Sequence, residues 1–178
     1  MNMIRRLLIA CTLAAALSAA AESTPATNYT DLWDNSAAPG TSSCPGGESG
    51  WGITFTQHGD NRVEAVWYTY DPRAADPSSP GNFKPLWIVM PDGTWTSPTQ
   101  LSGNLYVTIG TVFSQPWNSA AFHATQVGTY VFDFSSSSVG TFRYNVAPAP
   151  ADVANSAGPA FNLPSFSGTK PICRNAFQ

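Results

Sequence analysis

The sequence predicts an all-β fold, an antiparallel meander of about seven or eight short strands that forms a barrel or a two-sheet sandwich. Only 11% of the 178 residues are charged, whereas Thr, Ser, Gly, Pro and aromatic residues are frequent, as in exported β-rich domains. Several segments alternate apolar and polar residues with the two-residue period of a half-buried strand. After the N-terminal segment, no stretch keeps the 3.6-residue apolar period of a helix, so helices should be short or absent.

The N-terminus predicts export. Arg5 and Arg6 precede an apolar run, and small residues lead up to Ala21. This three-part pattern is typical of a secretory signal peptide over residues 1–21, cleaved after Ala21. Residues 22–178 then form a single secreted or periplasmic domain, because their number is that of an ordinary single domain.

The first part of that domain predicts a pair of strands, and an additional N-terminal strand near 29–33 is left open. The strand 51–57 alternates apolar and small polar residues. It is joined to the strand 62–70 through a turn in which Gly59 and Asp60 suit a two-residue hairpin loop with Gly first.

That loop fixes an expected register between the two strands. It places Trp51 opposite Tyr68 and Gly52 opposite Trp67, where the glycine leaves room for the indole ring. A slip of one residue would reassign every face. In either register, strand 62–70 carries apolar side chains on both faces, so the second face is covered by a loop, fills a lumen or binds a ligand.

The remaining strands are read from shorter runs. We expect strands at 85–90, 94–96, 103–110, 128–134, 140–146 and 169–177, with an Asp92-Gly93 turn between the first two. Three long segments without a strand pattern interrupt this series: 71–83, 113–127 and 147–168. Loops of about 13 or more residues are usually functional or disordered.

Charge and histidine content exclude several classes of function. The formal net charge is −3, and cleavage after Ala21 removes two of the eight basic residues, so nucleic acid is an unsuitable partner. No later segment approaches a membrane-spanning length, so no stable membrane insertion is expected. The two histidines, His58 and His123, lie far apart in a hairpin turn and a loop, and we predict no metal site and no cofactor.

Two cysteines remain after cleavage, Cys44 and Cys173. Two thiols in an oxidising compartment usually pair, and a bridge closing nearly the whole domain would contribute about 4–5 kcal/mol by loop-closure arguments. The alternative is a pair of free thiols in a catalytic or metal site, which would need histidine partners nearby.

Carboxylates are the main route to catalysis here, because no nucleophile, phosphate-binding or metalloprotease motif is present. Glu48 lies in the glycine-rich stretch Cys-Pro-Gly-Gly-Glu-Ser-Gly-Trp-Gly, residues 44–52. Its carboxylate either accepts backbone N–H groups that shape the start of a strand, or is desolvated beside Trp51. A hydrolase would pair Glu48 with Glu64 or Asp60, within about 5–10 Å.

Aromatic side chains are the stronger signal for binding. Aromatic faces in β-domains suit sugar rings or other flat ligands, and they also suit plain packing in a core. The predicted ligand-binding residues are Glu48, Trp51, Trp67, Tyr68, Tyr70 and Trp87.

Three motifs of this chain resemble those of a known family. The chain contains Asn-Tyr-Thr-Asp-Leu-Trp at 28–33, Glu-Ser-Gly-Trp-Gly at 48–52 and Gln-His-Gly-Asp at 57–60. It resembles a bacterial family of secreted or cell-envelope β-domains of unknown function with the signature NYTDLW…ESGWG…QxGD, and the likeness extends to the C-terminus. The resemblance implies a β-rich domain and supplies no catalytic residues. Such domains usually lack cysteine at positions 44 and 173, and the two departures together favour their pairing.

These observations predict an exported, non-catalytic β-domain that binds a glycan, an envelope component, a small apolar ligand or a protein partner. The alternative is a small secreted hydrolase that uses a carboxylate pair around Glu48.

Overall fold

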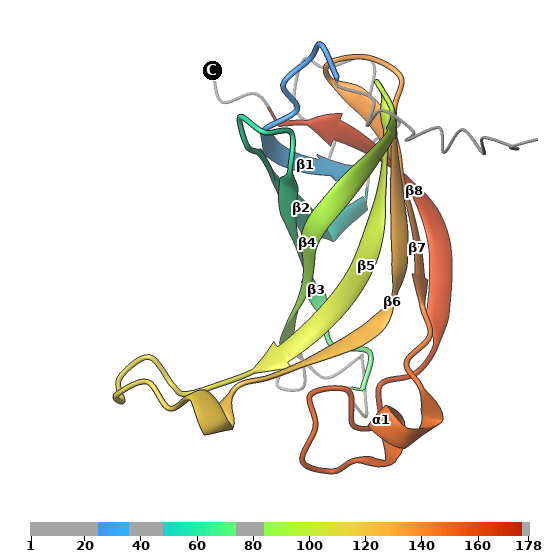
Figure 1. The fold of residues 1–178 in the computed structure, drawn as a ribbon. Coiled ribbons are helices and arrows are strands. Elements are labelled where there is room, and N and C mark those ends of the chain that lie inside the picture. The colour runs from blue at the N-terminus through green and yellow to red at the C-terminus, as the bar shows by residue number, and fades with distance from the viewer. Residues whose placement is uncertain (1–24, 36–47, 74–83, 176–178) are drawn as a thin grey trace, which may run out of the picture.

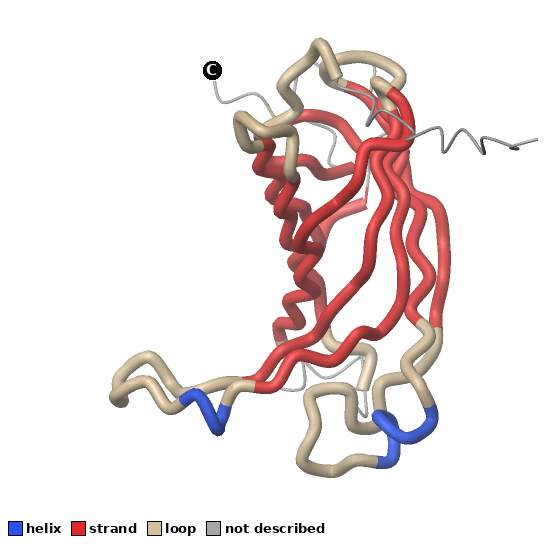
Figure 2. The backbone as a smooth tube through the Cα atoms, viewed as in Figure 1, coloured by secondary structure: helices blue, strands red, loops and turns tan. Residues whose placement is uncertain are grey.

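The protein is a closed β-barrel. The computed structural model describes residues 25–35, 48–73 and 84–175. Each of its eight strands pairs antiparallel with the next, and β8 returns to β1 (Figures 1 and 2). The elements are β1 (Asp31–Asn35), β2 (Glu48–Gln57), β3 (Val63–Tyr70), β4 (Pro85–Ser97), β5 (Gln100–Ile109), η2 (Ser119–Ala121), β6 (His123–Phe134), β7 (Val139–Val146), α1 (Pro150–Ala154) and β8 (Phe166–Arg174). The all-β prediction is confirmed, and of the two predicted architectures the barrel is the one formed.

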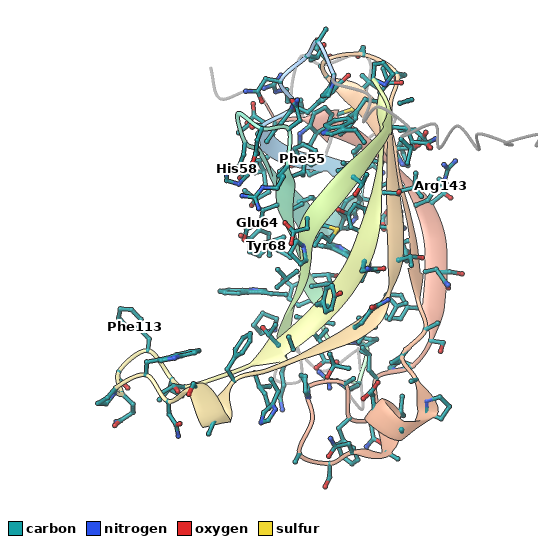
Figure 3. The ribbon with its side chains drawn as sticks, viewed as in Figure 1. Phe55, His58, Glu64, Tyr68, Phe113 and Arg143 are labelled. Carbon is teal, nitrogen blue, oxygen red and sulfur yellow. The ribbon has the colours of Figure 1, made fainter. Side chains whose placement is uncertain are left out.

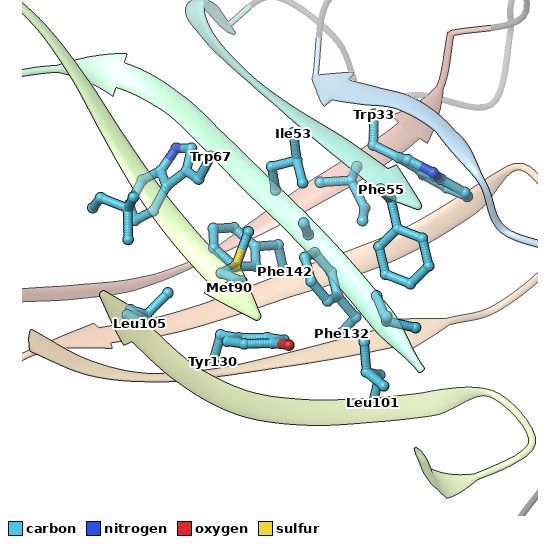
Figure 4. Close-up of a cluster of buried hydrophobic side chains, with 14 of the residues drawn as sticks. Trp33, Ile53, Phe55, Trp67, Met90, Leu101, Leu105, Tyr130, Phe132 and Phe142 are labelled. Carbon is cyan, nitrogen blue, oxygen red and sulfur yellow. The ribbon is translucent and has the colours of Figure 1, made fainter. Parts of the chain in front are cut away.

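Alternation along each strand sends apolar side chains into the barrel and polar ones outward. Phe132 and Phe142, on neighbouring strands, stack with their ring centroids 5.0 Å apart, and Phe55 meets Phe132 edge-on at 5.5 Å. The inner side chains form one continuous cluster, with Trp33 towards one end and Trp67 towards the other (Figure 4). Stacked and edge-on pairs of this kind are each worth about 0.5–1.5 kcal/mol beyond their buried area.

The predicted register of β2 and β3 is wrong by one residue. Gly52 pairs with Tyr68 and Ile53 with Trp67, because the connection has five residues rather than two. The N–H of His58 donates to the Arg62 carbonyl at 2.8 Å, and Asn61, at φ 63°, completes the reversal. The shift turns the Trp67 ring into the core and the Tyr68 ring outward.

The predicted Asp92-Gly93 turn is also wrong, because β4 is a single strand that runs through it. Asp92 adopts φ 52°, and the pairing with β3 changes register here, yet Gly93 still pairs with Val63. A bulge bends a strand without ending it when the neighbouring strands pair beyond it. The predicted strands 85–90 and 94–96 are therefore one element.

Both ends of the barrel are covered. The segment that precedes β1 lies at the upper end in Figure 1, and the ring of Tyr29 in this segment stacks on Phe134 with centroids 3.9 Å apart. At the lower end, the segment 147–165, which includes α1, inserts the buried residues Ala160 and Leu163 into the core cluster. An aromatic side chain thus covers one end of the barrel interior, and a loop covers part of the other end.

The connection between β5 and β6, residues 110–122, which includes η2, projects from the barrel as an arm, seen at the lower left of Figure 1. Pairing between the strands persists to Ile109 and His123. His123 therefore begins β6, and the prediction of a loop over 113–127 is wrong at its C-terminal end. Among the described residues, no helix is long and apolar enough to cross a membrane.

Candidate functional site

A pocket of about 160 Å³ opens in the lower half of the barrel interior. Five of the side chains that line it are aromatic, and three are polar. The lining residues are Glu48, Trp51, Trp67, Thr69, Phe142, Tyr144, Phe166 and Lys170. We refer to it as the lumen pocket.

The topology explains where the polar rim of the pocket lies. β1 has only five residues, and its last described pairs join Asp34 to Cys173 and Asn35 to Glu48. The earlier part of β8 pairs with β7. Lys170 lies two positions before the buried Ile172 on β8, so alternation places it on the inner face. Its ammonium group reaches the start of β2.

The Lys170 Nζ and Glu48 Oε1 atoms are 2.5 Å apart and form a half-exposed ion pair. The hydrogen bond to Glu48 raises the pKa of Lys170, against a smaller effect of burial in the opposite direction. A half-exposed pair contributes little to stability, about 0–1 kcal/mol. Its significance here is chemical, because it places one cation and one anion beside an aromatic cavity.

Two indole N–H groups at the pocket have no hydrogen-bond partner. The Nε1 atoms of Trp51 and Trp67 are both buried, and neither meets an acceptor among the described residues. By contrast, the Trp33 and Trp95 indoles each donate to a backbone carbonyl at 2.9 Å. A buried donor without a partner costs about 1–3 kcal/mol. The two indoles that line the pocket therefore carry a cost that a bound acceptor would remove.

The Trp67 ring is held rigidly. It is 6% exposed, and its centroid lies 5.1 Å from Phe142 and 4.8 Å from Tyr144. These two aromatic neighbours from β7 thus fix one wall of the pocket before any ligand arrives.

The structure brings together three of the six predicted ligand-binding residues. Glu48, Trp51 and Trp67 all line the lumen pocket. The other three, Tyr68, Tyr70 and Trp87, lie outside the barrel on β3 and β4, where they are exposed. The prediction combined residues of the barrel interior with residues of its outer wall. Neighbouring residues of a strand point to opposite faces, so closeness in sequence does not place their side chains in one site.

The predicted carboxylate pair is not assembled. Glu64 pairs with Thr56, eight residues along β2 from Glu48, or roughly 26 Å at the usual rise per residue. Asp60 lies in the hairpin connection beyond it, where its carboxylate accepts from Arg62 at 2.9 Å. Neither carboxylate shares a cleft with Glu48.

Five lining residues were not predicted: Thr69, Phe142, Tyr144, Phe166 and Lys170. The alternation in 140–146 does place Phe142 and Tyr144 on one face. The sequence contains no signal that β7 and β8 face β2 across a closed barrel, and that closure creates the pocket.

The predicted disulfide remains a prediction. Cys173 is largely buried in β8, next to β1. Cys44 and the predicted signal peptide lie outside the described residues. Within the described ranges, no group of three or more His, Cys, Asp or Glu side chains is arranged to hold a metal ion.

Comparisons with protein families, curated proteins and solved structures found no match to this chain.

Proposed function

We propose that the protein is an exported, non-catalytic binding domain that holds one small, largely apolar ring in its lumen pocket. Eight-stranded barrels have interiors that are either filled by side chains or hold one small ligand. In this barrel, large buried side chains form a continuous core cluster, and the lumen pocket lies beside Trp67 and Phe142 of that cluster. A dry cavity of about 150 Å³ is known to accept benzene, so a pocket of about 160 Å³ has the capacity for one ring.

The observation that carries the proposal is the pair of unpartnered indole N–H groups, of Trp51 and Trp67, beside the Lys170 ammonium. Three donors around an aromatic cavity favour a ligand with acceptor oxygens, such as an aromatic carboxylate or ketone. A sugar ring fits less well, because each hydroxyl buried in the pocket needs a partner and five of the eight lining side chains are aromatic.

The exposed residues Tyr68, Tyr70 and Trp87 offer a second, glycan-binding candidate. Trp87 is 61% exposed and Tyr70 55%. However, the Tyr68 and Trp87 rings meet at 78°, so they form no continuous flat platform for neighbouring sugar rings. The lumen pocket is therefore the better-supported site. The hydrolase alternative is weaker still, since neither Glu64 nor Asp60, the partners predicted for Glu48, lines the lumen pocket.

The test is titration with 4-fluorobenzoate followed by fluorine NMR, with 4-fluorotoluene as a matched ring that lacks the carboxylate. We expect saturable binding of one molecule of each probe. Trp67→Phe keeps an aromatic ring and removes the N–H, so it should weaken 4-fluorobenzoate binding about tenfold, the worth of one hydrogen bond, and leave 4-fluorotoluene binding nearly unchanged.

Trp87→Phe is the control, because it alters an exposed ring outside the barrel. If neither probe shows saturable binding to the unaltered protein, the proposal is refuted. An equal effect of the Trp67 and Trp87 substitutions would place the site elsewhere.

A further inference from the structure

The projecting arm, residues 110–122, ends in apolar side chains that nothing in the described structure covers. Phe113 is fully exposed, Trp117 is 67% exposed, and Val112 and Phe122 are also open to solvent. Figure 3 shows Phe113 at the outer end of the arm, well away from the barrel. Exposed apolar groups gathered in one place usually mark an interaction site.

Hydrogen bonds and a ring contact within the arm give it a defined conformation. Thr111 and Asn118 join across it, with the Asn118 N–H donating to Thr111 Oγ1 at 2.9 Å. The Asn118 side chain then caps η2 by accepting from the Ala120 N–H. The Trp117 and Phe122 rings pack with centroids 5.9 Å apart. The apolar tip is therefore presented in a defined shape, and little conformational entropy remains to be lost on binding.

The arm is also free of charge. From Gly93 to Phe132 the chain has no Asp, Glu, Lys or Arg, and His123 at the base of the arm is the only titratable group apart from tyrosines. Burying this surface in an apolar medium would thus desolvate no charged side chain.

We propose that the tip of the arm, Val112, Phe113, Trp117 and Phe122, docks reversibly into the interfacial layer of an uncharged, zwitterionic lipid bilayer. Indole rings favour this layer because one edge is apolar and the other donates a hydrogen bond. A convex tip can enter a fluid interface without a matching cavity.

The net charge sets the lipid preference. The chain carries a formal charge of −3, and no cation on the arm offsets it. Anionic lipid should therefore weaken binding rather than strengthen it, most clearly at low salt.

The test is flotation of the full protein with phosphatidylcholine vesicles. We expect the unaltered protein to float with the vesicles, and less so when phosphatidylglycerol is added. Removing a buried aromatic anchor weakens partitioning about tenfold, so Phe113→Ser and Trp117→Ser should each do so, and the double variant should not float. Trp87→Ser, which removes an exposed aromatic from the barrel wall, is the matched control and should float normally.

Thermal unfolding checks that the arm variants keep the fold, as expected for side chains without packing partners in the barrel. If the unaltered protein does not float, or if Trp87→Ser loses as much binding as Phe113→Ser, the proposal is wrong. If the protein does not bind vesicles and the arm substitutions instead abolish its self-association, the tip is a protein interface, and this result also contradicts the proposal.

Discussion

The phenol of Tyr130 lies inside the barrel between two glycines. A Cβ atom at Gly103 would lie 2.8 Å from the Tyr130 hydroxyl oxygen, and one at Gly93 would be closer still. The hydroxyl is buried and has no hydrogen-bond partner among the described residues. Glycine at these two positions makes room for the ring but supplies nothing to satisfy its O–H group.

Tyr130→Phe should therefore stabilise the protein by about 1 kcal/mol, since it removes an unsatisfied buried group and keeps the ring. Urea unfolding near neutral pH measures this. A loss of stability on removing the hydroxyl would mean that the O–H group has a partner in solution, such as a buried water molecule.

The same tyrosine predicts a pH dependence. Burial, with a smaller contribution from the Asp92 carboxylate, raises the Tyr130 pKa well above its usual value near 10. The unfolded chain then releases the phenol proton first as pH rises, so stability falls above about pH 10. In urea unfolding between about pH 8 and pH 11, Tyr130→Phe should lose less stability than the unaltered protein. Parallel losses would contradict this assignment.

At the scale of elements, the β6–β7 pairing depends on a close approach at Gly128. A Cβ atom there would overlap the backbone carbonyl oxygen of Asn145 on β7, and backbone cannot move aside as a side chain can. Gly128→Ala should lower the free energy of unfolding by more than about 2 kcal/mol, in the range of strongly disruptive substitutions.

Gly59→Ala is the control for Gly128→Ala. Gly59 lies in the β2–β3 connection, and a Cβ atom there meets nothing within 4 Å. It should change stability by no more than about 0.5 kcal/mol. Equal thermal shifts for the two variants would rule out the steric account.

The lower cover of the barrel is tied down by Arg73. Its guanidinium donates to the carbonyls of Pro159 and Phe161, at 3.0 Å each, and to the Asp71 carboxylate at 2.7 Å. Burial opposes ionisation of Asp71, but the bonds from Arg73 outweigh it and lower the pKa of that carboxyl. One side chain thus joins the end of β3 to the segment 147–165.

Arg73→Met should free that segment, because the two carbonyls lose their donor. We expect a loss of about 1–3 kcal/mol and faster hydrogen exchange over 159–163. The ionised Asp71 stabilises the fold above its unfolded pKa of 3.8, and this is lost as pH falls through the lower folded value. The variant should therefore lose less stability on acidification. Unchanged exchange in the segment would show that Ala160 and Leu163 hold it unaided.

The differences between predicted and observed elements have a common cause. Period-two alternation located each strand, because it reports burial of one face, but it divided β4 into two and placed the start of β6 too late. Turn chemistry was less informative: Asp92-Gly93 forms a bulge and Gly59-Asp60 lies within a longer connection. A short Asp-Gly or Gly-Asp sequence can form a tight turn, a bulge or part of a longer connection. The outcome depends on whether the neighbouring strands continue to pair beyond it, and the local sequence does not determine this.

For the whole molecule, the sequence predicted the class of fold and three residues of the candidate site, Glu48, Trp51 and Trp67. It could not predict the opposite wall, because Phe142 and Lys170 meet β2 only when the barrel closes. The lumen pocket and the arm lie towards the same end of the barrel, since β3, β5 and β7 all finish there. A domain docked through its arm would bring the pocket near the bilayer, a source of apolar ligands.

The most direct test of the lumen pocket is the indole N–H region of a proton–nitrogen NMR spectrum during titration with 4-fluorobenzoate. The signals of Trp51 and Trp67 should shift as their unpartnered donors gain an acceptor. Those of Trp33 and Trp95, already bonded to backbone carbonyls, should remain in place. If the Trp51 and Trp67 signals do not move at saturation, or move no more than the other two, the lumen pocket is not the binding site.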